Sequence, residues 1–235
     1  MDNAIYTSLT RQSGLWAEMR AVANNVANAA TTGYRAEGVM YSEWVAALGE
    51  HPSLSMAATR VRETSFAQGA LTQTGGPFDL AIEGDGFFLV QAPGGVRLTR
   101  AGHFTPNQNG DLVTPEGYPV LDPGGAPIFV PPGEIGIAAD GTISADGQPV
   151  GQVGLVQPLD PLGLRREDGV RFDAPGGWAP AEGGRILQGF LEEANTDPVR
   201  EIARMIEVSR AYELGQSLID REDERIRSAI RDLTR

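Results

Sequence analysis

The sequence predicts an α+β protein, mainly β, with one helix at each end of the chain and a β-rich domain between them. Two observations predict this arrangement. Glycine and proline are concentrated between about residues 69 and 189, and the two ends are nearly free of them. Apolar residues recur at helical spacing in both end segments, whereas short apolar runs separated by Asp-Gly and Asn-Gly pairs fill the middle.

The N-terminal segment, residues 1–35, is predicted to be a helix that ends before Gly33. Its apolar stripe advances in alternating steps of four and three residues, which is the heptad spacing of a coiled coil. The stripe consists of Ile5, Leu9, Gln12, Trp16, Met19, Ala23, Val26 and Ala30. Glycine directly after a helical stripe is a typical helix stop.

Three asparagines stand beside this stripe in the stretch "VANNVANAATTGYR": Asn24, Asn25 and Asn28. Asparagine is a poor helix former because its amide competes with the backbone for hydrogen bonds. An amide can both donate and accept. We therefore expect these side chains, together with Gly33, to shape the helix end or to bond to neighbouring helices in an assembly.

Residues 36–68 show no clear period, so we expect an irregular or extended connecting segment with at most one helical turn. Residues 69–189 are predicted to form the β-rich domain. Two short strands should flank Gly84-Asp85-Gly86, and four dipeptides are typical hairpin turns. They are Asn109-Gly110, Glu116-Gly117, Asp140-Gly141 and Asp146-Gly147.

The C-terminal segment, residues 190–235, is predicted to carry the second helix. Asp197 is a good N-cap, and Pro198 suits the first helical position. We expect the seam between the two helices, or between subunits, to contain Ile5, Leu9, Trp16, Met19, Ile202, Met205, Tyr212 and Ile219. Each helix has a thin apolar face and would be marginal alone, so we expect the helices to pair in a coiled-coil-like inner domain and to need further partners.

Trp16 and Tyr212 admit two interpretations: packing between the two helices of one chain, or anchoring of a subunit interface, where aromatic residues dominate the binding energy. The seam also includes polar positions such as Ser209 and Gln216. Polar seam residues reduce stability but can fix the register of the helices.

Composition narrows the function. The formal net charge of −12 argues against nonspecific binding of nucleic acid. The absence of cysteine excludes disulfides and cysteine-based metal sites. The N-terminus lacks the basic start and apolar run of a cleaved secretory signal, and no stretch approaches the roughly 20 apolar residues of a membrane span.

Catalytic and ligand-binding motifs are not recognisable. The two histidines, His51 and His103, do not match a zinc spacing, and no nucleophile elbow, phosphate loop or dinucleotide fingerprint is present. Glu83 and Asp85 are better explained as a solvated turn than as a catalytic pair. "NQNGDL" departs from the calcium-loop pattern. We expect no enzyme activity, no cofactor, no metal site and no small-molecule substrate.

Four sequence blocks resemble the flagellar rod, hook and hook-junction proteins. They are "VANNVANAATTGYR", "QGALTQTGGPFDLAIEGDGFFLV", "LTRAGHFTPNQNGDLVTPEGYPVL" and "LQGFLEEANTDPVREIARMIEVSRAYE". The blocks occur in order and cover both ends and the centre of the chain. The short length and the opening "MDNAIYTSLTRQSGL" resemble the proximal-rod members of the family more than the distal-rod or the longer hook members.

The resemblance implies a structural subunit of the flagellar basal-body rod, the drive shaft that transmits torque from motor to hook. It implies a helical tube of copies of this chain and other rod proteins, crossing the periplasm, with the terminal helices as the inner domain and the β domain outside. It further implies export by the flagellar type III apparatus without a cleaved signal peptide, and contact with surrounding ring proteins is a further expectation.

Other functions compete with this one. A distal-rod or hook-type subunit is the nearest alternative within the family. A cell-wall glycan-binding β protein with helical tails is a second alternative, against which the lack of an acid–base constellation argues. A free adaptor that binds through its C-terminal helix is a third, but an adaptor would need only one helical seam.

Overall fold

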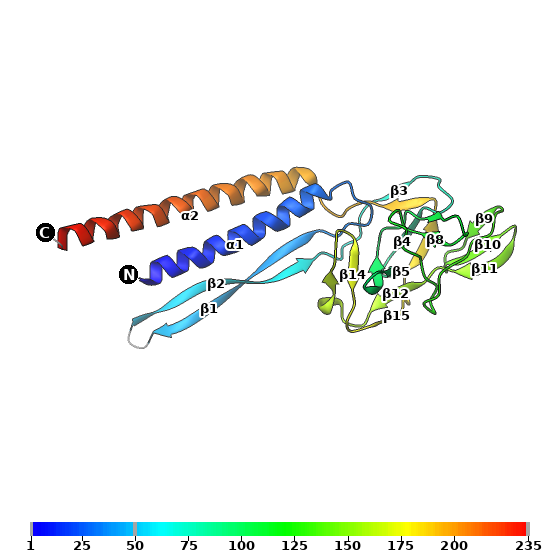
Figure 1. The fold of residues 1–235 in the computed structure, drawn as a ribbon, viewed down its shortest axis with the longest axis horizontal. Helices are drawn as coiled ribbons and strands as arrows, with labels where there is room; N and C mark the ends of the chain where they lie inside the picture. The colour runs from blue at the N-terminus through cyan, green and yellow to red at the C-terminus, as the bar shows by residue number, and fades with distance from the viewer. Residues whose placement is uncertain (1, 49–50, 234–235) are drawn as a thin grey trace. The chain divides into compact units, whose positions relative to one another are not determined.

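The computed structural model describes residues 2–48 and 51–233 of the chain. They form two compact units (Figure 1). The first, called here the helical unit, consists of Met1–Ala27, Ala36–Ser65 and Thr196–Arg235. The second, the β unit, consists of Asn28–Arg35 and Phe66–Asn195. Helices and sheets are both substantial, so the chain has the α+β class predicted from its sequence.

The two terminal helices are α1 (Asp2–Ala27) and α2 (Pro198–Leu233). The Asp197 carboxylate accepts the backbone N–H groups of Val199 at 3.0 Å and Arg200 at 3.4 Å, which satisfies two of the unpaired donors at the start of α2. The predicted cap and first helical residue of α2 are thus confirmed. Helix α1 stops at Ala27, and Thr31 donates its N–H to the Asn28 carbonyl in the turn that follows.

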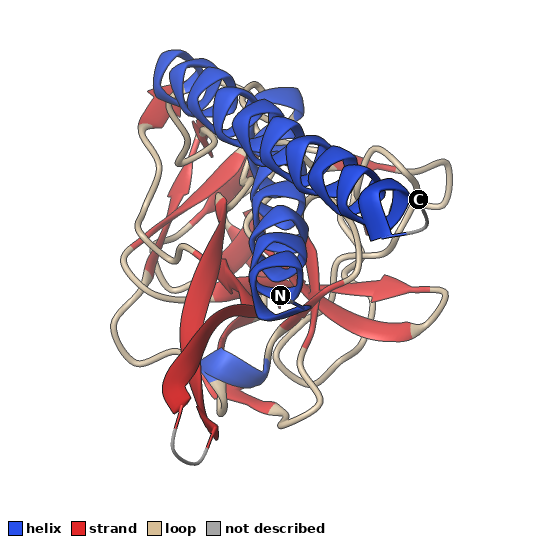
Figure 2. Ribbon diagram, turned by 90° about the vertical axis from the view of Figure 1, so that its left-hand side faces the viewer, coloured by secondary structure: helices blue, strands red, loops and turns tan. Residues whose placement is uncertain are grey.

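Residues 36–68, expected to be irregular or extended, largely form a paired hairpin of β1 (Glu37–Leu48) and β2 (His51–Thr64). Both strands contact α1 and belong to the helical unit (Figure 2). The register shifts between Met40 and Tyr41 and again between Ala46 and Leu48. A bulge exchanges the two faces of a strand, so an alternating pattern is interrupted and the sequence shows no clear period.

The β unit contains a six-stranded antiparallel sheet and several smaller ones. The order in the large sheet is β13-β14-β6-β5-β12-β15. The strands of this sheet are β5 (Phe87–Ala92), β6 (Gly95–Thr99), β12 (Leu155–Pro158), β13 (Arg165–Arg166), β14 (Arg171–Asp173) and β15 (Trp178–Pro180). One smaller sheet contains three strands, β9 (Ile135–Ile137), β10 (Thr142–Ala145) and β11 (Gln148–Gln152), with β10 in the middle. The other sheets are pairs of strands: β4 (Leu80–Glu83) with β16 (Arg185–Gln188), β3 (Leu71–Gln73) with β17 (Phe190–Glu192), and β7 (Thr105–Pro106) with β8 (Leu112–Val113).

Strand β5 lies between two apolar cores. Phe88 and Val90 belong to one cluster, and Phe87 and Leu89 belong to the other. Side chains alternate between the faces of a strand, so a continuous apolar run such as "FFLV" is expected where both faces are buried. This explains why the segment after Gly86 lacks the polar alternation of an ordinary half-exposed strand.

The predicted turns are confirmed. Gly110, Gly117, Gly141 and Gly147 all have positive φ angles, between 79° and 88°. At the tip of the β10–β11 hairpin, Asp146 has a φ of 49° and Gly147 a φ of 79°. Two successive positive φ angles define the type I′ turn, whose twist matches that of the flanking strands.

Candidate assembly interface

Helices α1 and α2 contact each other through polar and small residues. The Gln12 side chain donates to the Tyr212 carbonyl at 3.0 Å, and Arg204 Nε donates to Glu18 Oε1 at 2.6 Å. Gly215 allows the helices to approach, because a Cβ at this position would lie 2.5 Å from Gln12 Nε2. Gln12, Glu18, Ala21 and Val22 are buried along α1.

The apolar positions predicted on α1 are therefore not the positions that α1 mainly buries. Leu9 and Trp16 remain about half exposed, at 50% and 52%, and Met19 is half-buried. The Arg20 guanidinium lies 4.9 Å from the centre of the Trp16 ring. Ile5 belongs to α1, but its side chain lies outside the described residues. In a single chain, Trp16 thus contributes little to packing between the helices.

Helix α2 carries apolar residues on two faces. Met205, Tyr212 and Ile219 are half-buried and share a face with buried Val208 and with Gly215, which faces α1. The large apolar side chains that α2 leaves exposed between residues 199 and 218, called here the outer face of α2, are Val199, Ile202, Ile206, Leu214 and Leu218, which are 49% to 76% exposed. Ile202, predicted to share the seam with the other three residues, lies on this outer face instead.

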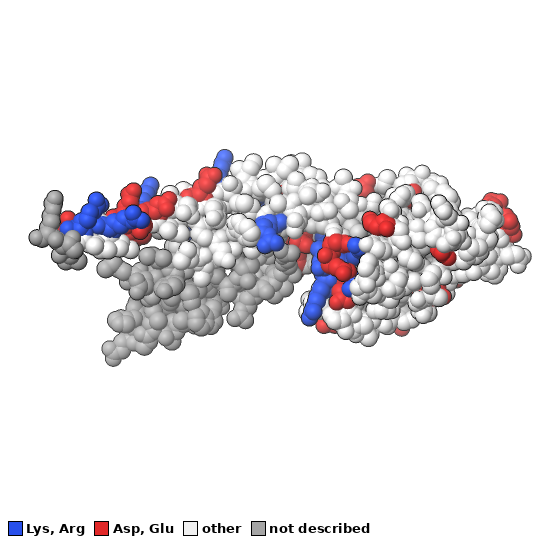
Figure 3. All heavy atoms as spheres, in the orientation of Figure 1, with Lys and Arg blue, Asp and Glu red and all other residues white. Residues whose placement is uncertain are grey.

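Charges on α2 gather toward its C-terminal end. Arg225 pairs with Glu222 at 2.7 Å and Arg227 with Asp223 at 2.9 Å, each within the helix. Figure 3 shows positive and negative side chains gathered near that end of α2. The outer face is thus an apolar stretch followed by a segment of intrahelical ion pairs. Rows of exposed large apolar side chains in a soluble protein mark interaction sites. No helix among the described residues is long and apolar enough to cross a membrane.

The three asparagines at the end of α1 have partners inside the chain. Asn25 is 2% exposed, and its amide donates to the Glu37 carbonyl at 2.9 Å and accepts the Glu37 N–H at 2.8 Å. Asn24 lies 3.4 Å from the Glu37 carboxylate, and the Asn28 side chain accepts from the Thr31 hydroxyl at 3.3 Å. The expected bonds to neighbouring helices are not needed to satisfy Asn25, which instead attaches the end of α1 to the first residue of β1.

Gly33 lies beyond the end of α1, and its backbone packs tightly against the backbone of Arg100 and Ala101. Its φ is +70°, and a Cβ there would come within 2.3 Å of the Ala101 nitrogen. Its N–H donates to the Glu192 carbonyl at 2.7 Å. A left-handed conformation and a close backbone contact both require glycine. The position predicted as a helix stop is therefore a packing position several residues beyond the end of α1.

Three buried charged residues, Arg35, Arg100 and Glu192, form a cluster next to Gly33 in the fold, called here the junction cluster. Arg35 Nη2 lies 2.9 Å from Glu192 Oε1, and Arg100 Nη1 lies 3.2 Å from Glu192 Oε2. The three side chains are at most 4% exposed. Further bonds run from Arg100 to the carbonyls of Ile82 and Gly84 and from the Gly69 N–H to Glu192.

Burial controls the electrostatics of the junction cluster. It lowers the pKa of Arg35, against the opposing charge of Glu192. It lowers the pKa of Arg100 to about 10, again opposed by Glu192. Arg100 thus remains protonated at neutral pH, and two guanidinium groups share one carboxylate. Such an arrangement is held by the ion pairs and hydrogen bonds that Glu192 makes with both guanidinium groups, because an unpaired buried charge is strongly unfavourable.

Sequence reasoning did not identify the junction cluster. Its residues stand in three of the four blocks that carry the family resemblance: Arg35 in "TTGYR", Arg100 in "LTRAGHF" and Glu192 in "GFLEEAN". The available signal was that a charged residue stands in each of three separate motif blocks. In the fold, the ion pairs of the junction cluster bring these three blocks together.

The other candidates for chemistry are occupied by local interactions. Glu83 pairs with Arg185 at 2.5 Å, and that hydrogen bond lowers the pKa of the Glu83 carboxyl. His103 Nδ1 lies 2.6 Å from Asp79 Oδ1. The Asn107 side chain accepts the N–H of Asn109 at 2.8 Å and of Asp111 at 2.9 Å, as in a turn. Across the part of the chain that the structure describes, no three His, Asp or Glu side chains gather as metal ligands.

A helix pair with uncovered apolar side chains, joined to a separate β unit, is typical of a structural protein that assembles into a larger body. Three protein-family models match the chain. They are Flagella basal body rod protein over residues 5–35, Flagellar hook protein FlgE/F/G D1 domain over residues 81–147, and Flagellar basal body rod FlgEFG protein C-terminal over residues 187–232.

Curated relatives match over nearly the whole chain. The flagellar basal-body rod protein FlgF of Caulobacter vibrioides is 43% identical, covering 99% of this chain and 98% of the relative. FlgF of Mesorhizobium japonicum is 40% identical over 93% of this chain and 92% of its own length. The rod protein FlgG of Bacillus subtilis is 30% identical over 95% and 96%. The chain belongs to the flagellar basal-body rod protein family, is most like FlgF, and is a structural subunit of the basal-body rod.

Proposed function

We propose that this chain is a subunit of the proximal rod and that its two helices form the inner domain of the rod wall. The observation that carries the proposal is the uncovered apolar surface of the helix pair: Leu9 and Trp16 on α1 and the outer face of α2. A layer of two helices cannot bury apolar residues on both of its sides, so neighbouring subunits would have to cover them.

In the proposed assembly, each subunit contacts copies of itself and other rod proteins through different surfaces. Heterologous contacts of this kind generate open helical arrays, and a tube of such subunits can transmit torque from motor to hook. The helices pack in a coiled-coil-like manner toward the tube axis, and the β unit lies outside them, where ring proteins can contact it. Higher identity to the FlgF relatives than to the FlgG relative favours the proximal over the distal rod.

The family also suggests the route to this location. We propose that the chain is exported by the flagellar type III apparatus without a cleaved signal peptide and that the rod it joins crosses the periplasm. The relatives are named as basal-body rod proteins, and a rod subunit must reach the growing end of a structure outside the cytoplasm.

Trp16→Glu tests the proposed interface. Trp16 is half exposed in the single chain, so a charge there should leave folding and export intact. In the assembly, the same carboxylate would have to be buried in place of an apolar ring, which is unfavourable even with Arg20 one turn away. We expect cells with Trp16→Glu as their only copy to secrete the subunit but to build no complete rod and to be non-motile. Basal bodies viewed by electron microscopy and the subunit content of purified basal bodies provide the measurement.

Trp16→Phe is the matched control, since it keeps an apolar aromatic side chain at the same position. It should assemble normally. Intact rods containing Trp16→Glu would contradict the assignment of this face, and loss of the secreted protein would instead indicate a folding or export defect.

A further inference from the structure

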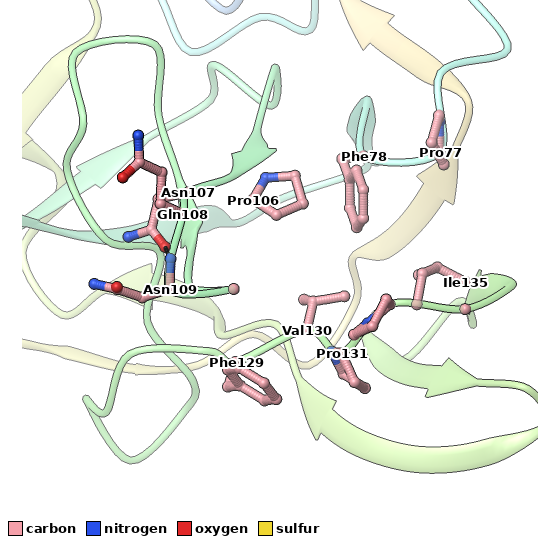
Figure 4. Close-up of a pocket in the computed structure, with 13 residues that line it drawn as sticks. Pro77, Phe78, Pro106, Asn107, Gln108, Asn109, Phe129, Val130, Pro131 and Ile135 are labelled. Carbon is pink, nitrogen blue, oxygen red and sulfur yellow. Dashed lines mark hydrogen bonds between the residues drawn. The ribbon is translucent and has the colours of Figure 1, made fainter.

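The β unit contains a preformed pocket without charged lining residues, called here the proline pocket. Its volume is about 490 Å³, and its walls include Phe78, Phe129, Pro106 and Pro131 (Figure 4). Gln108 and Asn109 lie at one side, where the picture shows their amides directed away from the aromatic rings. In a chain of net charge −12, an uncharged pocket selects for an apolar occupant rather than an ion.

Local contacts hold the proline pocket open in its observed shape. Phe129 is 54% exposed, yet its ring lies on the Gly110 turn so closely that a Cβ at Gly110 would be 2.5 Å from it. Asn107 fixes the same turn by accepting two backbone N–H groups. An occupant would therefore meet a rigid site, which reduces the entropy lost on binding.

The same unit presents an apolar projection of matching chemistry, called here the leucine knob, Leu159–Gly163. Leu162 is 97% exposed and Leu159 is 65% exposed. The knob is also rigid. Pro161 opens a short 3₁₀ turn, η1 (Pro161–Gly163), and the Asp160 carboxylate accepts the Gly163 N–H at 3.0 Å. A nearly fully exposed leucine on a fixed turn has no packing role within the chain.

Charges beside the two features are complementary. Arg165 follows the knob and Glu134 lies between two residues of the pocket lining, and both are exposed. Neither has an ion-pair partner among the side chains that the structure describes. Within one chain, knob and pocket are separate, because the prolines of the knob region line a different cavity of about 250 Å³ beside Phe66 and Phe87. Contact between the knob and the proline pocket therefore requires a second copy of the chain.

We propose that the leucine knob of one subunit inserts into the proline pocket of a neighbouring copy of this chain, with Arg165 close to Glu134 across the contact. The contact joins two different surfaces and is heterologous, so it can repeat along a helical array. It rests on the proposed rod function and adds to it an outer contact between β units, independent of the helices. Burying Leu162 against two phenylalanines and several prolines would exclude water from this uncharged pocket.

Disulfide cross-linking tests the contact directly, because the chain contains no cysteine of its own. The variant carries Leu162→Cys and Gln108→Cys and is expressed as the only copy in flagellated cells, which are then mildly oxidised. Disulfides require Cα atoms within about 7 Å, so only seated knobs can react. We expect dimers and larger products of this chain in purified basal bodies, and none with either cysteine alone. Leu162→Cys with Gln91→Cys is the matched control, since Gln91 is exposed on the same unit but away from the pocket lining.

The outcomes separate this proposal from the proposed function. Subunits that are present in basal bodies but cross-link no more than the control would overturn the knob-and-pocket contact and leave the rod function intact. A product that joins this chain to a different protein would overturn it as well. If the cysteine-free chain itself were absent from basal bodies, the rod function would fail. As a second variant, Leu162→Asp should abolish cross-linking between Gln108→Cys and Leu159→Cys, while Val150→Asp, also at an exposed apolar site, should not.

Discussion

Asn25 shows how a single residue can resolve a conflict between local preference and tertiary structure. Its side-chain amide binds both the backbone N–H and the backbone C=O of Glu37, as a residue of a neighbouring strand would. An alanine would favour the helix more but could satisfy neither group. The asparagine at this helix position is therefore explained by its bonds to Glu37 of the same chain, and no neighbouring subunit is required.

Asn25→Ala should destabilise the helical unit of the isolated protein. It leaves a buried N–H and a buried C=O of Glu37 without these bonds, and each such loss costs about 1–3 kcal/mol. Denaturant unfolding followed by circular dichroism at helical wavelengths measures the change. Asn24→Ala is the control, since Asn24 is exposed and its bond is long, and it should stay within about 0.5 kcal/mol of the parent. Equal stability of the two variants would refute the explanation.

At the scale of elements, the junction cluster joins three segments of the β unit: the stretch after α1, the residue after β6 and the last residue of β17. Glu192 lies at 0% exposure between two guanidinium groups. Its backbone carbonyl also accepts from Gly33, so both main chain and side chain of this strand hold the same junction. Helix α2 begins six residues later, which makes β17 the route by which the C-terminal helix is attached.

Glu192→Gln should be one of the most destabilising conservative changes in the β unit. It keeps the shape but removes the only negative charge that contacts Arg35 and Arg100 directly in the junction cluster, and breaking a buried ion pair typically costs about 3–5 kcal/mol. Equilibrium unfolding in urea measures it. Glu193→Gln provides the comparison, because Glu193 is exposed and its carboxylate accepts a hydrogen bond from the Thr72 hydroxyl at 2.6 Å, not from a buried guanidinium. An effect at Glu192 no larger than at Glu193 would show that the cluster is not a main source of stability.

At the scale of the whole molecule, the chain consists of two units that differ in how well they cover their apolar residues. The β unit has two buried clusters on the two faces of β5, whereas the helical unit leaves the outer face of α2 uncovered. Among the described side chains of α2, Val208 is the one that is buried. Regions with little buried apolar surface open first under native conditions.

Trypsin should therefore cut α2 before it cuts the β unit. All 19 cationic residues are arginine, so cleavage reports only on arginine positions. Arg221, Arg225 and Arg227 are exposed on α2, whereas Arg35 and Arg100 are buried. We expect the first fragments of the purified monomer, identified by mass spectrometry, to end at positions 221–227. The same sites should be protected in purified basal bodies. First cleavage within residues 66–195 would contradict the proposed difference between the units.

Much of the fold could be predicted because its signals are local. The cap at Asp197, the turn glycines and the two strands around Gly84–Gly86 each depend on a few neighbouring residues. The hairpin over residues 37–64 could not be predicted in this way. Its register shifts exchange the two faces of each strand, so the sequence has no regular alternation of apolar and polar residues there. The predicted seam combined Ile202 with Met205, Tyr212 and Ile219, but Ile202 is 50% exposed whereas the other three are half-buried, and only the packing of the helix decides this difference.

The sequence by itself determined the α+β class, the helices at both ends, the positions of the turns and membership of the rod family, since each depends on short patterns. Only the tertiary structure decided which side of α1 is buried, which partner Asn25 binds and how Arg35, Arg100 and Glu192 meet. Glu192 lies 157 positions from Arg35 and 92 from Arg100 along the chain. Contacts over such separations depend on where independently formed elements meet in space, and no local pattern encodes that meeting.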